Sequence, residues 1–136
     1  MKIQESAENY LEAILVLKEQ KGNVRSIDIA HHFNFSKPSV SVAMKNLRNA
    51  EYVTVDSDGF LSLTDSGRQI AETIYERHTV LSSMLITLGV PEEIATEDAC
   101  RIEHVISPES FHAIKEHLSS QEHLKALKHK DISTIT

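Results

Sequence analysis

The chain has 136 residues, with 14 Lys and Arg against 20 Asp and Glu, which gives a formal charge of −6 at pH 7. This length is enough for one domain, or for two small ones that share a core, and the single Cys excludes an internal disulfide. No run approaches the roughly 18 apolar residues of a membrane-spanning helix, so we expect a cytoplasmic protein without a membrane partner, whose acidity argues at first against nucleic acid.

The first predicted helix follows Ser6 as its cap and stops at Gly22. Between these residues, apolar side chains from Ala7 to Leu17 recur at the i, i+3, i+4, i+7 spacing of one helix face. The whole chain holds only four Gly and three Pro, which leaves little material for turns. The composition therefore favours a mainly α fold.

Two short helices are predicted next. Ser26 is placed as the cap of the first, and the second begins at Lys37 and Pro38, since Pro is tolerated in a first helical turn. About three residues, 34–36, connect them. Two short helices joined in this way indicate a helix-turn-helix.

The pattern after Glu51 changes to period two. Residues 52–55 and 60–63 alternate around Asp58-Gly59, a dipeptide that favours a tight hairpin turn. A helix-turn-helix followed by a hairpin is a winged helix. We therefore predict a DNA-binding domain over residues 1–71.

The remainder, residues 72–136, is predicted to be an all-helical dimerisation domain. Thr64 caps a long fourth helix that ends at Gly89, Pro91 opens a fifth, and Ser107-Pro108 start a sixth. An apolar stripe as long as that of the fourth helix needs a partner. The stripe consists of Ile70, Ile74, Leu81, Leu85 and Leu88, and the fifth helix carries Ala95, Ala99, Ile102 and Ile106 on one side.

Charge is distributed unevenly. Residues 1–71 hold 8 basic and 9 acidic side chains, whereas residues 72–136 hold 6 and 11, and the segment 29–50 has no carboxylate. A helix that enters the major groove needs a small, uncharged or basic outer face. The third predicted helix has such a face, so the predicted DNA-contacting residues are Ser36, Lys37, Pro38, Ser39, Ser41, Val42 and Lys45.

Two details qualify this interface. Val42 is predicted to pack on thymine methyl groups, although single exposed apolar residues are ordinary on protein surfaces. Asp56 and Asp58 in the hairpin repel phosphate. We therefore expect the wing to contribute little to DNA binding.

A second group of residues has side chains of the kinds that bind metal ions. Cys100, Glu103 and His104 stand at i, i+3 and i+4, which places a thiol, a carboxylate and an imidazole on one side of a helix. His78 takes a position on the apolar seam where Leu is expected. The alternatives are a Cys buried as a small hydrophobe and a hydrogen-bonded core His. On the first helix, Asn9 and Glu12 lie one turn apart and can complete a metal site.

The segment Asp98–Val105 resembles the metal-dependent repressors of the diphtheria toxin repressor and manganese transport regulator family. The resemblance covers nearly the whole chain. Its supporting segments are residues 8–14, Ile29-Ala30, residues 36–41, residues 63–68 and Arg77-His78. It implies a homodimer that binds an inverted-repeat operator on double-stranded DNA when Fe²⁺ or Mn²⁺ is abundant and shuts off metal-uptake genes.

The resemblance also assigns ligands. Cys100, Glu103, His104 and His78 match family ligands, and Glu12 matches a carboxylate ligand of the manganese-sensing branch. Asn9 departs from both branches, which have Met or Asp there. Ser82 and Thr96 replace ancillary ligands of the iron branch. We expect one site, or a close pair of ions sharing Glu103, and no third, barrel-like domain.

The choice of metal depends on Cys100. A thiolate is softer than a carboxylate and favours Fe²⁺ or Zn²⁺ over Mn²⁺, so Fe²⁺ is the first expectation and Mn²⁺ the second, with Zn²⁺ or Co²⁺ as substitutes in vitro. We expect a cation held by the first helix and by the dimerisation half to select the arrangement in which two recognition helices fit DNA.

Two other functions remain open. The chain can be a metal-independent winged-helix regulator that senses a small molecule, or the redox state through Cys100. It can also be a small metallohydrolase with Glu103 as base, but no motif for a substrate pocket or a second catalytic carboxylate accompanies it. We expect a regulator with no enzyme activity and no small organic substrate.

Overall fold

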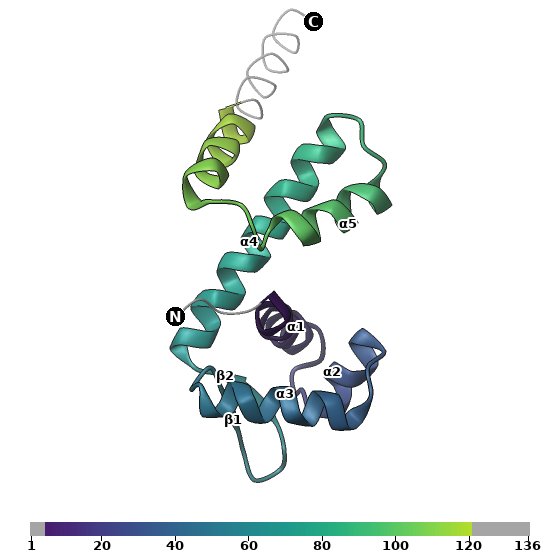
Figure 1. The fold of residues 1–136 in the computed structure, drawn as a ribbon, viewed down its shortest axis with the longest axis vertical. Coiled ribbons are helices and arrows are strands. Elements are labelled where there is room, and N and C mark those ends of the chain that lie inside the picture. Colours follow the sequence, from purple (N-terminus) through teal and green to yellow (C-terminus); the bar gives the residue numbers. More distant parts are fainter. Residues whose placement is uncertain (1–4, 121–136) are drawn as a thin grey trace, which may run out of the picture. The chain divides into compact units, whose positions relative to one another are not determined.

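The computed structural model describes residues 5–120, and the chain divides into two units, Met1–Glu76 and Arg77–Thr136. Within the described residues there are six helices and one two-stranded sheet, which confirms the mainly α fold (Figure 1). The division falls inside α4, the helix that also contains the predicted boundary between residues 71 and 72. Residues 121–136 of the predicted dimerisation domain lie outside the described part.

Helix α1 (Glu5–Lys21) carries the core of the first unit. Its apolar face is buried as its spacing predicts, and Gly22, at φ 85°, turns the chain away after the last residue. Ser6 lies inside the helix rather than at its cap, so the predicted start was too late. The buried residues are Leu11, Ala13, Ile14, Leu15 and Leu17.

The predicted helix-turn-helix is present as α2 (Ser26–Phe33) and α3 (Lys37–Asn49). The prediction that Ser26 caps α2 was wrong, because Arg25 is the capping residue and Ser26 is the first helical one. Asp28 causes this shift: its Oδ2 accepts the Arg25 N–H at 2.8 Å. This bond from the third helical residue back to the cap residue is one half of a capping box.

Helix α3 starts where the sequence predicts. Ser36 is the cap, its Oγ accepts the Ser39 N–H at 3.4 Å, and Pro38 stands in the first turn. The inward face of α3 seals the helix to the core through Val40, Met44 and Leu47, which are all buried. The opposite face is exposed to solvent, with Val42 at 60%.

The wing is an antiparallel hairpin of β1 (Val53–Val55) and β2 (Leu61–Leu63), in which Val53 faces Leu63 and Val55 faces Leu61. Gly59 takes φ 85°, the left-handed conformation that the Asp58-Gly59 turn predicts. The Leu61 N–H donates to the Val24 carbonyl at 2.7 Å. This bond ties the wing to the loop that precedes α2.

Helix α4 (Asp65–Thr87) is capped by Thr64, as predicted. The Thr64 hydroxyl accepts the Gly67 N–H at 3.1 Å and donates to the Glu51 carbonyl at 2.7 Å. A Cβ at Gly67 would collide with the backbone oxygen of Tyr52. Glycine is therefore required where the helix leaves the wing.

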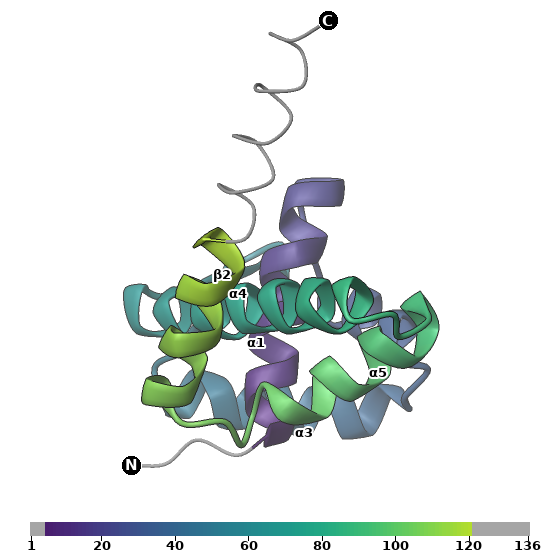
Figure 2. The ribbon, with the colours of Figure 1, turned by 90° about the horizontal axis from the view of Figure 1, so that it is seen from above.

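In the second unit, α5 (Glu92–Ile102) folds back antiparallel to the C-terminal part of α4 (Figure 2). Pro91 caps α5, and a further helix covers residues 108–120. The predicted extension of the fifth helix to Ile106 was wrong, and Leu88 lies beyond the end of α4, 73% exposed. None of the helices in the described range is long and apolar enough to span a membrane.

Candidate metal centre and DNA-binding face

Glu103 is the centre of the polar site in the second unit. It directly follows α5, and it is the one charged residue of the described range that is fully buried, with 0% exposure. A carboxylate removed from water costs several kcal/mol unless positive charge or hydrogen bonds compensate it. The surroundings of Glu103 must therefore supply positive charge or hydrogen bonds.

Two imidazoles approach the two oxygens of this carboxylate. His78 Nδ1 lies 2.9 Å from Glu103 Oε2, and His104 Nε2 lies 3.4 Å from Oε1. The His104 side chain is only 2% exposed, whereas that of His78 is 27% exposed. His78 thus stands on α4 as a polar residue directed at Glu103.

Cys100 completes the cluster. Ligand atoms of Cys100, Glu103 and His104 all lie within 4.8 Å of one another. The cysteine is exposed, so the alternative of a buried small hydrophobe is wrong. The prediction that all three stand on one helix also needs correction, since Glu103 and His104 lie in the turn that follows α5.

Arg77 explains why the helix ends there. Its Nη1 donates to the Glu103 carbonyl at 3.2 Å and to the Ile106 carbonyl at 3.1 Å, and its guanidinium lies over the Phe111 ring. A cation at a helix C-terminus satisfies carbonyls that lack helical partners. The sequence interpretation missed this role, although Arg77 stands beside a predicted ligand.

The residues present fit a transition-metal ion. Thiolate, carboxylate and imidazole are the donors that such ions prefer. Among the described residues, Glu103 Oε1 is buried and makes no hydrogen bond, and His104 Nε2 lies 3.4 Å from it. A cation would compensate this buried charge.

The remaining residues singled out in the sequence are two predicted ligands in the first unit and two residues that replace ancillary ligands. Asn9 and Glu12 are one turn apart on α1 in the first unit, and both are half-buried. Ser82 is on α4, and the Thr96 hydroxyl donates to the Glu92 carbonyl inside α5 at 2.8 Å. The structure therefore brings Cys100, Glu103, His104 and His78 together within the second unit.

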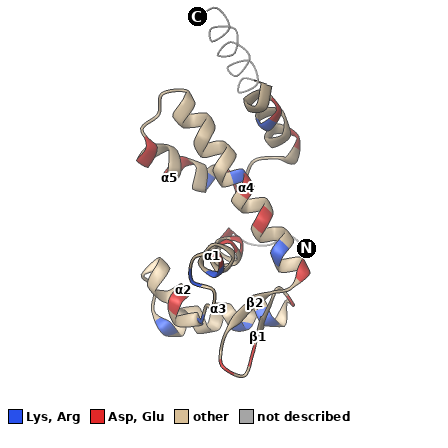
Figure 3. Cartoon of the chain, turned by 180° about the vertical axis from the view of Figure 1, so that it is seen from behind, with Lys and Arg blue, Asp and Glu red and all other residues tan. Residues whose placement is uncertain are grey.

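The seven residues predicted to contact DNA lie on one stretch of the first unit, from the cap of α3 to Lys45, and all are exposed. Figure 3 shows basic but no acidic positions on α3, whereas acidic positions occur on the hairpin. Ser36 and Ser39 share a hydrogen bond of 2.8 Å between their hydroxyls. The set contains Ser36, Lys37, Pro38, Ser39, Ser41, Val42 and Lys45.

Two family profiles match this chain, one for each part. Residues 2–60 match the profile described as "Iron dependent repressor, N-terminal DNA binding domain". Residues 64–129 match the one described as "Iron dependent repressor, metal binding and dimerisation domain". Together the two profiles cover nearly the full sequence.

Relatives of this family are transcriptional regulators. The "Transcriptional regulator MntR" of Escherichia coli O6:H1 is 32% identical over 119 residues, which cover 88% of this chain and 76% of the relative. The "HTH-type transcriptional regulator MntR" of Bacillus subtilis is 34% identical over 130 residues, which cover 96% of this chain and 91% of the relative.

Solved structures share the fold. A "Manganese-dependent transcriptional repressor complex with manganese" superimposes with a TM-score of 0.76 and 27% identity over 83% of this chain, and T. acidophilum IdeR with 0.72 and 27% over 88%. The matched parts make up 52% and 55% of those chains, so this chain spans about half the length of either protein.

Proposed function

The chain belongs to the iron-dependent repressor family, and on this premise we propose that its homodimer represses metal-uptake genes. In this proposal the dimer binds an inverted-repeat operator on double-stranded DNA when a divalent transition metal is abundant. The metal thus acts as corepressor. Such a regulator works in the cytoplasm, where the DNA is.

One observation carries the proposal: a fully buried Glu103 carboxylate shares a cluster with Cys100 and His104 in a chain that also holds a winged helix. A buried carboxylate flanked by a thiol and imidazoles is costly unless a cation or protons neutralise it. Regulation by a metal gives this costly arrangement a purpose.

The proposed ligands are Glu103, Cys100, His104 and His78, joined by the oxygen donors of Asn9 and Glu12. When bound, the cation supplies positive charge that offsets the buried carboxylate and fixes the surrounding side chains. Arg77 holds the turn that carries Glu103 and His104 by binding the carbonyls of Glu103 and Ile106. A well-held turn presents its donors with little loss of conformational entropy.

For the identity of the metal we propose Fe²⁺ ahead of Mn²⁺. The manganese-dependent names belong to the relatives, whereas the Cys100 thiolate is a softer donor and favours Fe²⁺ in this chain. Replacing Cys100 by Glu should shift the preference toward Mn²⁺. Zn²⁺ and Co²⁺ are expected to substitute in vitro.

For the homodimer we propose an interface on the second unit. Ile86, Leu88, Ile94 and Val105 expose 45 to 79% of their surface there. Several large apolar residues exposed on one small unit are typical of a protein contact. The two recognition helices of such a dimer would need a separation of about 34 Å, one turn of DNA, or a multiple of it.

The test is selection of bound duplexes from a random double-stranded DNA pool. Parallel arms contain Mn²⁺, Zn²⁺, anaerobic Fe²⁺ or a chelator. We expect an inverted repeat to be enriched only with metal, and Glu103→Ala or His104→Ala to abolish the enrichment while far-UV circular dichroism and dimerisation are retained. Glu97→Ala, at an exposed position of α5, is the matched control.

Enrichment that survives the chelator would overturn the proposal. It would favour the metal-independent regulator that senses a small molecule or oxidation of Cys100. Enrichment with metal that is unchanged in Glu103→Ala would instead refute the assigned site. Glu12→Gln and Asn9→Ala test the two α1 residues in the same assay.

A further inference from the structure

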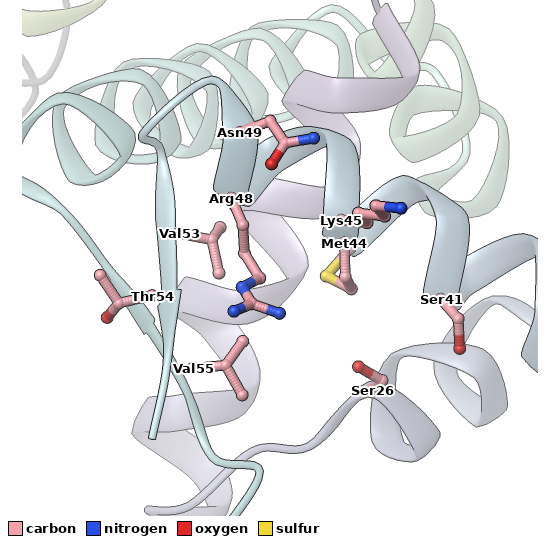
Figure 4. Close-up of a pocket in the computed structure, with 9 residues that line it drawn as sticks. All are labelled: Ser26, Ser41, Met44, Lys45, Arg48, Asn49, Val53, Thr54 and Val55. Carbon is pink, nitrogen blue, oxygen red and sulfur yellow. The ribbon is translucent and has the colours of Figure 1, made fainter. Parts of the chain in front are cut away.

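A cavity of about 740 Å³ opens on the first unit between α3, β1 and the start of α2. We infer that it seats a phosphate of the operator backbone, held by Arg48 and Lys45; this inference rests on the proposed DNA-binding function. Figure 4 shows the lining residues, which are Ser26, Ser41, Met44, Lys45, Arg48, Asn49, Val53, Thr54 and Val55.

The charge of the lining is positive. Lys45 and Arg48 are its two ionised side chains, and no carboxylate accompanies them. With Ser41 they follow i, i+4, i+7 spacing and form one stripe along α3. Neither cation has an ion-pair partner within residues 5–120, so both charges are available to an anion.

The start of α2 faces the same cavity. Ser26 is the first residue of this eight-residue helix, whose first-turn N–H groups and positive dipole end favour an anion. Asp28, the acid two residues after Ser26, is engaged by other groups: its carboxylate accepts the Arg25 N–H and lies 2.7 Å from Lys21 Nζ. Asp28 therefore does not cancel the positive character of the cavity.

The floor of the cavity is formed by buried core residues. Met44 and Val53 are buried, and β1 forms one wall, with the Val53 and Val55 side chains on the Arg48 side of the strand and that of Thr54 on the other side (Figure 4). The two acids of the wing, Asp56 and Asp58, are not among the lining residues, and Asp56 Oδ1 accepts the N–H groups of Asp58 and Phe60 at 2.9 Å each. The root of the wing thus takes part in the site although its tip does not.

The position of the cavity agrees with how a helix-turn-helix docks. The N-terminal part of the recognition helix reads base edges, while the first helix of the motif crosses the sugar–phosphate backbone. Pro38 and Val42 occupy the N-terminal part of α3, whereas Arg48 lies near its C-terminus and shares the cavity with Ser26. A phosphate is therefore the group expected there, and a guanidinium can bind it with two parallel hydrogen bonds.

The experiment measures binding of a duplex selected in Mn²⁺ by wild type, Arg48→Gln and Arg68→Gln over a series of salt concentrations. Arg68 pairs with Glu72 outside the cavity and controls for the lost charge. We expect Arg48→Gln to weaken binding about tenfold and to lower the slope of log K against log salt by about two, because a dimer loses two phosphate contacts. Arg68→Gln should leave the slope nearly unchanged.

A methylphosphonate scan of the same duplex locates the phosphate. Neutralising one phosphate in each half-site should weaken wild type much more than Arg48→Gln, in which only the Lys45 contact to that phosphate is left to lose. Inorganic phosphate at millimolar concentration should not compete; competition by it would instead indicate a site for free phosphate and overturn the assignment to the backbone. Equal losses for both proteins at every position would also overturn it.

These outcomes are separable from failure of the proposed function. If wild type shows no metal-dependent DNA binding, the proposed function fails. If wild type binds with metal and Arg48→Gln has the affinity and salt slope of Arg68→Gln, only the cavity assignment fails. The ratio of affinities with and without Mn²⁺ should be equal in wild type and Arg48→Gln.

Discussion

The two units differ in the kind of residues that they bury. The first unit buries a continuous apolar cluster that joins α1, the helix-turn-helix, the wing and the start of α4. Among its described residues, up to 120, the second unit buries few large apolar side chains, and polar groups surround the buried Glu103. We therefore expect the first unit to be stabilised mainly by apolar burial, and the second to gain much of its stability from a bound cation and a partner surface.

The largest expected effect comes from removing a buried side chain from the core of the first unit. Ile14 is fully buried on α1, and Ile14→Ala should destabilise the first unit by about 3 kcal/mol, measured by urea unfolding with circular dichroism. Leu88→Ala, at a 73% exposed position, should cost less than about 0.5 kcal/mol in dilute protein but weaken dimerisation. Equal losses in the two variants would contradict the comparison.

Metal binding should stabilise mainly the second unit. At about 100 times its dissociation constant, Mn²⁺ should stabilise the binding-competent state by about 2.7 kcal/mol. Hydrogen exchange with mass spectrometry should therefore slow at residues 99–106 and, in the first unit, only near Asn9 and Glu12. Protection spread equally over α3 and the wing would show that the units do not differ in this respect.

A smaller change should follow from loosening the turn that carries the ligands. Arg77→Lys keeps the charge but loses the planar guanidinium that spans the Glu103 and Ile106 carbonyls. We expect Mn²⁺ affinity to fall about tenfold, as for other residues that orient metal ligands. The electron paramagnetic resonance signal of free Mn²⁺ measures this, with Arg101→Lys on the exposed side of α5 as control. Unchanged affinity would remove Arg77 from the site.

Local signals in the sequence predicted the first unit well. Ser36 and Thr64 cap helices, and Asp58-Gly59 turns the wing, because each depends on residues within a few positions along the chain. The misplaced cap at Ser26 has a similar local cause. Asp28 competes for the capping role from inside the helix, which the preference for a Ser cap does not reveal.

Two features could not be predicted from the sequence, the end of α5 in the second unit and the cavity of the first unit, and the cause is different. The end of α5 is fixed by Arg77, whose side chain binds the Glu103 carbonyl from a position 26 residues earlier in the chain. The cavity joins Ser26, Arg48 and Thr54 from three elements. Helical periodicity describes one element at a time and does not predict such meetings.

The smallest predicted effect concerns the ion pair at the start of α2. The Lys21 ammonium, which donates to the Asp28 carboxylate, and the Arg25 N–H lower the pKa of Asp28 below its ordinary value of 3.8. A lowered pKa stabilises the folded state above about pH 4 and stops doing so as pH falls through the folded value. Acid should therefore remove the contribution of Asp28, and base should not.

The variant that isolates this contribution is Asp28→Asn. At pH 7 it should destabilise the first unit by about 1 kcal/mol, because it weakens both the cap and the pair with Lys21. The difference from wild type, measured by urea unfolding from pH 7 to pH 2, should shrink below pH 4 as wild-type Asp28 becomes neutral too.

Lys21→Met should shift the onset of this loss to higher pH, since it removes the main cause of the lowered pKa of Asp28. A difference that stays constant with pH would mean that Asp28 acts by hydrogen bonding alone. Metal should not change this result, because the pair lies in the unit that depends on burial.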